Sequence, residues 1–256
     1  MSSLSFLGNA TSYLNIPNTD VFDFGTGDFT IEWYQYQTDN NSYPRIFQVG
    51  TYPSISIGIS IEGNDLLYWT NDVWTVAAGL PPASYKNTWA HFAICRANGL
   101  TTIYMNGSSL FSTNVINNFN GTNDLTIGNQ SDPSNVGAFG GYITYFSWVK
   151  GVALYTADFT VSTNYPTFTN NNVLLLTAPI FSGTLGSTVV NNNVSTTPNV
   201  PPGFSSTPIP PPPPPPVRPS SKPLFSNNSL VFYKAGSLAS GGVGSVRNSS
   251  AKARRT

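Results

Sequence analysis

The chain has 256 residues, of which 9% are charged and 13% aromatic, and its 11 basic and 11 acidic residues give a formal net charge of zero. No apolar run approaches the length of a transmembrane helix, and one cysteine excludes an internal disulfide. The abundance of β-branched residues, aromatic residues, Asn, Gly and Pro predicts one large all-β domain with additional segments.

The first strands are expected near the amino terminus. Residues 4–6 form a short apolar segment, and residues 27–34 alternate strictly, with Phe29, Ile31 and Trp33 on one side. A period of two predicts a strand with one buried face. We expect the other strands to be arranged around this one, as sheet packed on sheet.

A meander of antiparallel strands is predicted over residues 45–69. Its members are residues 45–50, 55–61 and 66–69. The four isoleucines of the second segment follow a period of two, so they are expected to share one face of the sheet. A turn at residues 64–65 joins the second and third segments.

Two further strands are expected at residues 89–96 and 102–105. Asn98-Gly99 separates them and Asn106-Gly107 follows them. Both dipeptides favour two-residue hairpin turns, because Asn and Gly tolerate positive φ. Residues 125–128 and 139–149 continue the sheets. The latter is apolar on both faces, which predicts a central strand, and residues 173–177 are expected to close a sheet.

The composition changes after about residue 180. Residues 181–223 form a linker rich in Ser, Thr and Asn, and they include the run of seven prolines at 210–216, which predicts a stiff polyproline II segment. Residues 224–256 hold a short apolar segment and a basic, Gly/Ser-rich tail. We therefore expect a folded domain at 1–180 and an extended Pro-rich C-terminal arm.

Charge is divided unevenly along the chain. All 11 acidic residues lie at or before Asp158, with four basic residues, and the other seven basic residues follow it. An acidic body with a basic tail indicates a partner, although a merely solubilising tail gives the same pattern. The first residues have no signal-peptide pattern, so we expect synthesis in a reducing compartment.

Several blocks together resemble a known family. They are GDFTIEW (27–33), TWAHFA (88–93), IYMNG (103–107), and GGYI (140–143) with LYTADFT (154–160). With the opening residues 5–17, they resemble the laminin G-like (LamG) family of concanavalin A-like jelly rolls. The resemblance implies a sandwich of two antiparallel sheets, one of them concave, that binds glycans or proteins.

The arm adds a second resemblance. A LamG-like domain followed by a Ser/Thr/Asn-rich stretch, a proline run and a basic tip is similar in style to virion proteins of large double-stranded DNA viruses, chlorovirus-like ones in particular. This implies a virion location, with other capsid or virion proteins as partners.

Catalysis is not expected. A glycosidase needs two carboxylates about 5–10 Å apart, and Glu32 has no acidic residue two positions before or after it, while Glu62 and Asp65 are separated by a turn. The only histidine, His91, is expected to be structural. Cys95 is about 13 Å further along an extended strand, too far to form a dyad with it.

Calcium is the one cofactor that the resemblance suggests, since family members often carry it at one rim of the sandwich. Calcium takes six to eight oxygen ligands. The candidate ligands are the loop residues Asp72, Asp124 and Asp132.

Carbohydrate recognition uses aromatic faces together with amide and backbone groups in loops. Trp69, Asn71 and Trp74 provide such groups in a loop-rich section, although packed core tryptophans are the simpler interpretation. Trp74, before the loop at residues 79–82, is the best candidate for an exposed aromatic side chain.

The basic tip is the predicted anchor of the tail, through Arg247, Lys252, Arg254 and Arg255. These residues suit acidic protein surfaces, including a sister copy. Contact with nucleic acid is the weaker alternative, because the tip has few aromatic residues.

The sequence thus predicts a non-enzymatic minor capsid or accessory virion protein, in which the sandwich decorates the shell and the arm anchors it to neighbours. The alternative is a lectin-like module that binds cell-surface glycans.

Overall fold

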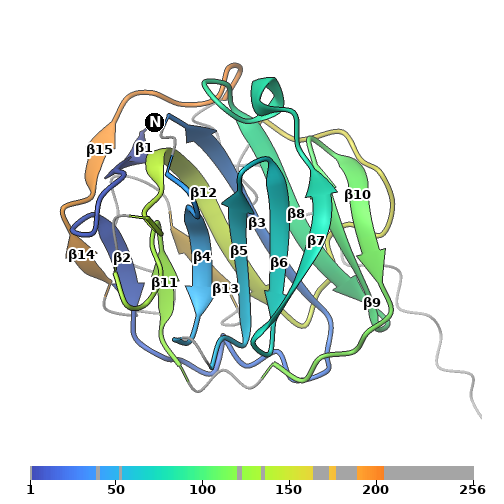
Figure 1. Cartoon of the computed structure of the whole chain (residues 1–256). Coiled ribbons are helices and arrows are strands. Elements are labelled where there is room, and N and C mark those ends of the chain that lie inside the picture. The colour runs from blue at the N-terminus through green and yellow to red at the C-terminus, as the bar shows by residue number, and fades with distance from the viewer. Residues whose placement is uncertain are drawn as a thin grey trace, which may run out of the picture. The chain divides into compact units, whose positions relative to one another are not determined.

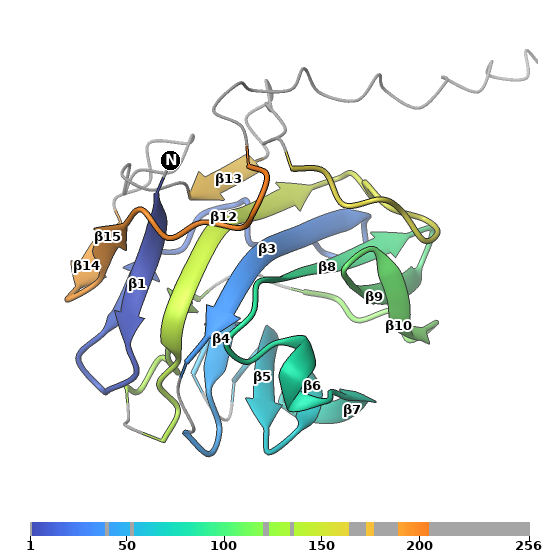
Figure 2. The same cartoon turned by 90° about the horizontal axis from the view of Figure 1, so that it is seen from above.

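The computed structural model describes residues 2–38, 41–51, 54–119, 123–133, 136–163, 173–176 and 189–204. In these ranges the chain forms two β-sheets packed face to face, and every pairing between named strands is antiparallel. Figure 2 shows the two layers, with β1, β12, β3 and β8 in one and β4 to β7 in the other. The predicted all-β, concanavalin A-like sandwich is confirmed. Within the described ranges, no helix is long and apolar enough to cross a membrane.

One sheet has eight strands. Its order is β10 (Ser108–Thr113), β9 (Leu100–Met105), β8 (Ala90–Ala97), β3 (Phe29–Gln37), β12 (Gly140–Lys150), β1 (Ser3–Leu7) and β15 (Ser195–Thr197). The eighth strand, β13 (Val173–Leu176), pairs with β12. The predicted central strand is therefore β12, which has β3 on one side and both β1 and β13 on the other.

The other sheet has seven strands. Its order is β14 (Val190–Asn192), β2 (Tyr13–Ile16), β11 (Leu125–Ile127), β4 (Arg45–Val49), β5 (Ile57–Glu62), β6 (Asp65–Thr70) and β7 (Val73–Gly79). These strands lie side by side across the front of Figure 1. A short 3-10 helix, Pro82–Ser84, follows β7.

The core fills the space between the sheets. Phe29, Ile31 and Trp33 have no exposed area, as the alternation of β3 predicts. The Trp33 ring stacks on Phe92, with ring centroids 5.5 Å apart, and meets Phe47 of the opposite sheet edge-on at the same distance. Such aromatic contacts add to the burial of apolar area and join the two layers.

The other face of β3 is also buried, which corrects the expectation of one buried face. Thr30 and Glu32 are at most 1% exposed. The segment 151–163, which follows β12, covers this face: Thr30 Oγ1 donates to the Val152 carbonyl oxygen, and the Tyr155 hydroxyl donates to Glu32. A period-two pattern cannot reveal this cover, since the covering segment is distant in sequence.

The predicted hairpin turns are confirmed. Asn98 and Gly99 have φ of 51° and 86° and join β8 to β9. Asn106 and Gly107 have φ of 50° and 84° and join β9 to β10. Positive φ at both central residues is the backbone of a type I′ turn.

The meander differs from the prediction at both ends. Ile57, Ile59 and Ile61 enter the main core, but Ile55 precedes β5 and packs with Leu67 and Trp69 in a separate cluster. The four isoleucines therefore do not share a face. At the other end, β7 was not predicted from the sequence. It is an edge strand whose residues are mostly exposed, so it lacks the apolar alternation of a half-buried strand.

The sandwich continues past the expected boundary at residue 180. Strands β14 and β15 pair with β2 and β1, so that part of the predicted linker completes one edge of each sheet. Their sequences, VNN and STT, are polar and show no apolar alternation, because edge strands need little core contact. The proline run lies outside the described residues.

Candidate functional site

A continuous row of directly paired residues crosses the seven-stranded sheet. Asn15 pairs with Thr126, Thr126 with Gln48, Gln48 with Gly58, Gly58 with Trp69, and Trp69 with Trp74. We call these six residues the cross-strand row. At about 4.8 Å between strands, its five steps span roughly 24 Å.

The row lies on the face of the sheet that points away from the core. The strand neighbours of its members, such as Leu14, Ile127 and Ile59, belong to the core, and side chains alternate between faces along a strand. The row therefore brings amide and hydroxyl groups together at one end of this face and two indole rings at the other.

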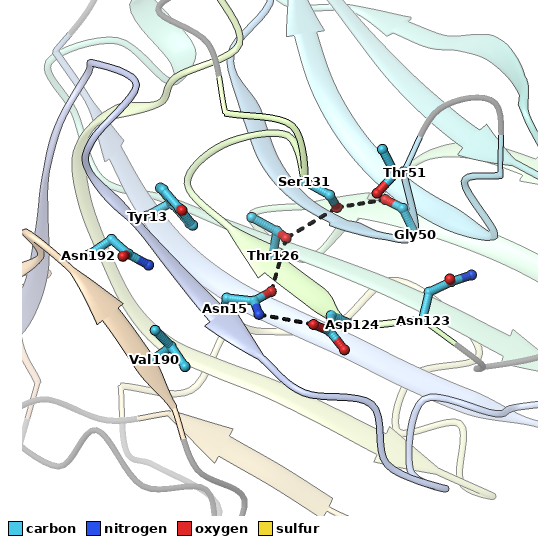
Figure 3. A pocket seen from close by; sticks show the side chains of 10 residues that line it. All are labelled: Tyr13, Asn15, Gly50, Thr51, Asn123, Asp124, Thr126, Ser131, Val190 and Asn192. Carbon is cyan, nitrogen blue, oxygen red and sulfur yellow. Dashed lines mark hydrogen bonds between the residues drawn. The ribbon is translucent and has the colours of Figure 1, made fainter.

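A pocket of about 470 Å³ opens over the polar end of the row (Figure 3). Four parts of the chain form it: β2, β14, the segment around β11, and the residues that follow β4. Its lining residues are Tyr13, Asn15, Gly50, Thr51, Asn123, Asp124, Thr126, Ser131, Val190 and Asn192. Among the described residues of this lining, one side chain is acidic and none is basic, while most of the others carry a hydroxyl or an amide.

Hydrogen bonds join the side chains at the base of the pocket (Figure 3). The Ser131 hydroxyl donates to the Gly50 carbonyl oxygen at 2.7 Å and lies 3.2 Å from the Thr126 hydroxyl. Asn15 Oδ1 accepts from Thr126 at 3.5 Å, and Asn15 Nδ2 donates to Asp124 at 3.0 Å. The pocket therefore presents an array of donors and acceptors whose positions are fixed before any ligand arrives.

Asp124, a predicted calcium ligand, is part of this array. One of its carboxylate oxygens accepts from Asn15, and the other accepts from the Asn18 backbone N–H at 2.9 Å. Both oxygens thus have protein donors, which join β2 and the residues after it to the residue before β11. A cation at this position would have to share them.

The other two predicted calcium ligands lie elsewhere. Asp72 belongs to the turn between β6 and β7, where its carboxylate accepts from the Ile55 N–H. Asp132 is exposed and lines a different, smaller cavity. Across the described residues, no three His, Cys, Asp or Glu side chains group closely enough to hold a metal ion. The structure does not bring the three aspartates together, and calcium stays a prediction.

The predicted sugar ligands lie together at the apolar end of the row. Trp69 and Trp74 are cross-strand partners, so their side chains share a face. Trp69 is 8% exposed and lines the smaller cavity, whereas Trp74 is 54% exposed. Asn71 and Asp72 have φ of 48° and 64° and form the turn between the two strands. The role of these residues in ligand binding stays a prediction.

A second polar cluster is buried under the segment 151–163, on the eight-stranded sheet. Glu32 accepts a hydrogen bond from the Tyr155 hydroxyl at 2.8 Å and from Ser147 at 3.3 Å, and His91 Nε2 lies 3.3 Å from it. Burial and the neighbouring Glu32 raise the pKa of Tyr155, so the tyrosine stays protonated and remains a donor. The cluster is enclosed, and its hydrogen bonds fasten the covering segment to the sheet.

His91 and Cys95 do not form a catalytic pair in this cluster. Cys95 is buried, lies beside Thr30 Oγ1 at 3.4 Å, and has a pKa raised to about 12 by burial. A thiol with such a pKa is protonated at neutral pH and is a poor nucleophile.

The pocket residues Asn15, Thr126 and Asn192 were not singled out from the sequence. The available signal was the alternation in β2 and β11, where polar residues occupy the positions between core residues. This alternation indicates which face of the sheet a residue occupies, but not which residues of other strands lie beside it. The predicted tail anchors, Arg247, Lys252, Arg254 and Arg255, lie outside the described residues.

Comparison with known proteins identifies the family. The model of the concanavalin A-like lectin/glucanases superfamily matches residues 7–163, and the chain belongs to this superfamily. A comparison with curated proteins found no match.

Solved structures share the fold at low sequence identity. The heptameric SAP-like pentraxin from Limulus polyphemus is similar with a TM-score of 0.55 and 14% identity, over 76% of this chain and 94% of that one. A candidate carbohydrate binding protein from Bacteroides ovatus is similar with a TM-score of 0.52 and 15% identity, over 77% of this chain and 59% of that one. At these identities the likeness concerns the fold alone.

Proposed function

We propose that the sandwich is a non-catalytic module that binds neutral carbohydrate in the 470 Å³ pocket between β2, β11 and β14. The observation that carries this proposal is the lining itself. Asn, Ser, Thr and Tyr side chains can each donate and accept hydrogen bonds, as the hydroxyl groups of a sugar do. Since no described residue of the lining is basic, phosphate and sulfate groups find no counter-charge in this part of the pocket.

Binding is favoured over hydrolysis because the carboxylates are dispersed. In the part of the chain that the structure describes, Asp124 is the one carboxylate that lines the pocket, and Asp132 is the one that lines the smaller cavity. Glu62 and Asp65 are cross-strand partners in the β5–β6 hairpin, but neither lines either cavity, and Glu62 forms an ion pair with Arg45 at 2.9 Å. Glycoside hydrolysis commonly needs two carboxylates that flank one bond.

The proposal is tested with the full chain on an array of neutral and anionic glycans, followed by titration calorimetry of the best ligand. Asn192 lines the pocket, and Asn192→Ala should weaken binding about five- to tenfold, since one or two hydrogen bonds are lost. Asn114→Ala is the matched control, because this asparagine is exposed and outside the pocket lining. An array without any neutral ligand, or equal affinities for the two variants, would refute the proposal.

A structural role in a virion is the second candidate, and one surface feature favours protein contacts. The edge strand β7 exposes Val73, Trp74 and Val76 by 63%, 54% and 45%, and it carries no charged residue. Exposed apolar edge strands tend to pair with or dock on other chains. The acidic body and basic tail of the sequence suit the same role, with capsid proteins as partners.

This second candidate is tested through the tail. Replacing Arg247, Lys252, Arg254 and Arg255 by Gln in the full chain should abolish binding to purified particles, or self-association in sedimentation velocity, at low salt. Replacing the same residues by Lys or Arg keeps the charge and is the control. Unchanged association of the Gln variant, or absence of the protein from purified particles, would contradict a virion anchor.

A further inference from the structure

The smaller cavity, of about 280 Å³, lies on the same outer face at the apolar end of the cross-strand row. It shares Thr51 with the larger pocket, and Gln48, Arg45 and Trp69 are among its lining residues. Its volume is close to the lower end of small-molecule sites, about 300 Å³, which suits one ring rather than a chain.

Gln48 presents a hydrogen-bond acceptor that no described group of the protein uses. The side chain is 2% exposed, and its Nε2 donates to the Gly50 carbonyl oxygen at 2.8 Å and to Ser131 at 3.2 Å. A carbonyl oxygen only accepts, so these contacts fix which end of the amide is nitrogen. Gln48 Oε1 is buried and has no partner among the described residues. A buried acceptor without a partner is costly, which makes it a prepared position for a ligand donor.

Arg45 presents a complementary donor. Its Nη1 is bound to Glu62 at 2.9 Å, and its guanidinium lies over the Trp69 ring at 4.7 Å. Its Nε is buried and also lacks a partner among the described residues. Glu62 offsets the positive charge, and Asp132 adds a negative charge at the rim, so the cavity offers a donor without an excess of positive charge.

The remaining wall is apolar and rigid. Trp69 packs with Ile55 and Leu67, and its indole N–H donates to Ser60 at 2.9 Å. Gly58 is the direct cross-strand partner of both Gln48 and Trp69, and it contributes no side chain between them. A Cβ at Gly58 would lie 3.1 Å from Gln48 Cβ, so a larger residue would crowd the amide.

We propose that this cavity is a second subsite, which holds a single ring of a neutral sugar. One hydroxyl of the ring donates to Gln48 Oε1, and a second oxygen accepts from Arg45 Nε. The apolar face of the ring lies against Ile55 and the edge of Trp69 that the Arg45 guanidinium leaves uncovered. The choice of a sugar rests on the proposed function, whereas the two unpartnered atoms and the cavity do not.

The test uses the full chain, labelled with nitrogen-15, and methyl glycosides of glucose, galactose, mannose, N-acetylglucosamine, fucose and xylose. The indole N–H of Trp69 reports on this cavity, and the side-chain amide of Gln48 reports on both cavities, since its nitrogen donates to Gly50 and Ser131 of the larger pocket. At least one glycoside, at a concentration near its solubility limit, is expected to shift both signals. If none does, the proposal is overturned, and it is overturned as well if inorganic phosphate shifts these signals in place of the sugars.

Two variants sharpen the test. Arg45→Lys keeps the charge beside Glu62 but removes Nε, and it should weaken the glycoside about five- to tenfold. Asp132→Tyr fills the exposed rim and should abolish the shifts without changing the core. An unchanged affinity in both variants would refute the assignment.

The larger pocket provides the comparison that separates the two proposals. Asn192→Ala should leave the shifts of Trp69 and Gln48 intact, because Asn192 lines only the larger pocket. Binding that depends on Asn192 and never affects Trp69 would support the proposed function and refute the second subsite. Shifts of the Trp69 signal without any binding that depends on Asn192 would support the second subsite and refute the proposed function of the larger pocket.

Discussion

The hydrogen bond between Tyr155 and Glu32 fastens the segment 151–163 to the eight-stranded sheet, and Tyr155→Phe removes it with little other change. The phenol donates to Glu32 Oε2 at 2.8 Å, and the ring stacks on Phe159 with centroids 3.6 Å apart. Phenylalanine keeps the stacked ring and loses only the hydroxyl. The variant therefore isolates one hydrogen bond to a buried carboxylate.

The expected loss follows from the surroundings of Glu32. The residue is 1% exposed, so water cannot replace the missing donor, although Ser147 and His91 remain beside the carboxylate. A hydrogen bond to a charged group contributes about 1.5–3 kcal/mol. We expect Tyr155→Phe to lower the free energy of unfolding by about 2 kcal/mol, and Tm by about 4–8 °C for a domain of this size.

The assay is urea unfolding followed by tryptophan fluorescence, with Tyr43→Phe as the matched control. Tyr43 is 48% exposed, and its variant should change the free energy of unfolding by less than about 0.5 kcal/mol. A double-mutant cycle with Glu32→Gln should give a coupling of at least about 1 kcal/mol. Additive effects, or a loss no larger than that of the control, would refute the role given to this bond.

Three other perturbations test separate parts of the structure. Burial raises the pKa of Cys95 from 9.0 to about 12, so the contribution of the protonated thiol to stability is complete below pH 9 and is lost as pH rises toward 12. Cys95→Ala should therefore flatten the alkaline fall in the free energy of unfolding, by up to about 1.4 kcal/mol per pH unit. An equal slope in the variant and the wild type would contradict this. Gly107→Ala places a Cβ against the Phe159 carbonyl oxygen at φ +84°, and it should lower the free energy of unfolding in urea by more than about 2 kcal/mol. Gly63→Ala, at φ +64° with open space around the new Cβ, should lower it by about 1 kcal/mol. Equal losses of unfolding free energy would rule out the clash. On thermal melting, Trp33→Ala should lower the free energy of unfolding by about 3–5 kcal/mol. Trp74 is 54% exposed, so Trp74→Ala should change this free energy by less than about 0.5 kcal/mol. A large loss at position 74 would show that this indole is packed.

Most strands of the sandwich could be predicted from local patterns. The alternation at Phe29, Ile31 and Trp33 and the Asn-Gly turns at 98–99 and 106–107 depend on neighbours within a few residues. Backbone geometry links such patterns directly to strands and hairpins. Strands β2, β7, β10, β14 and β15 were given no residue range from the sequence. All but β2 are edge strands, which need neither alternation nor a full apolar face, and β2 has only four residues.

The candidate site could be predicted only in part. Trp69 and Trp74 were singled out as residue types suited to sugars, and the fold places them side by side on one face. The pocket that joins Asn15, Asp124 and Asn192 depends on pairings of β2 with both β11 and β14. Residues more than 60 positions apart give no local signal of such contact.

The sequence by itself determined the class of fold, the turns that set strand register, and the uneven distribution of charge between body and tail. Only the tertiary structure decided which polar groups converge and which stay without partners. Gln48 illustrates the difference: its place in β4 follows from alternation, but its unpartnered oxygen results from Gly50 and Ser131, which occupy the nitrogen of the same amide. Strand patterns arise from interactions between near neighbours, whereas a binding site arises from the packing of distant segments, which no single segment encodes.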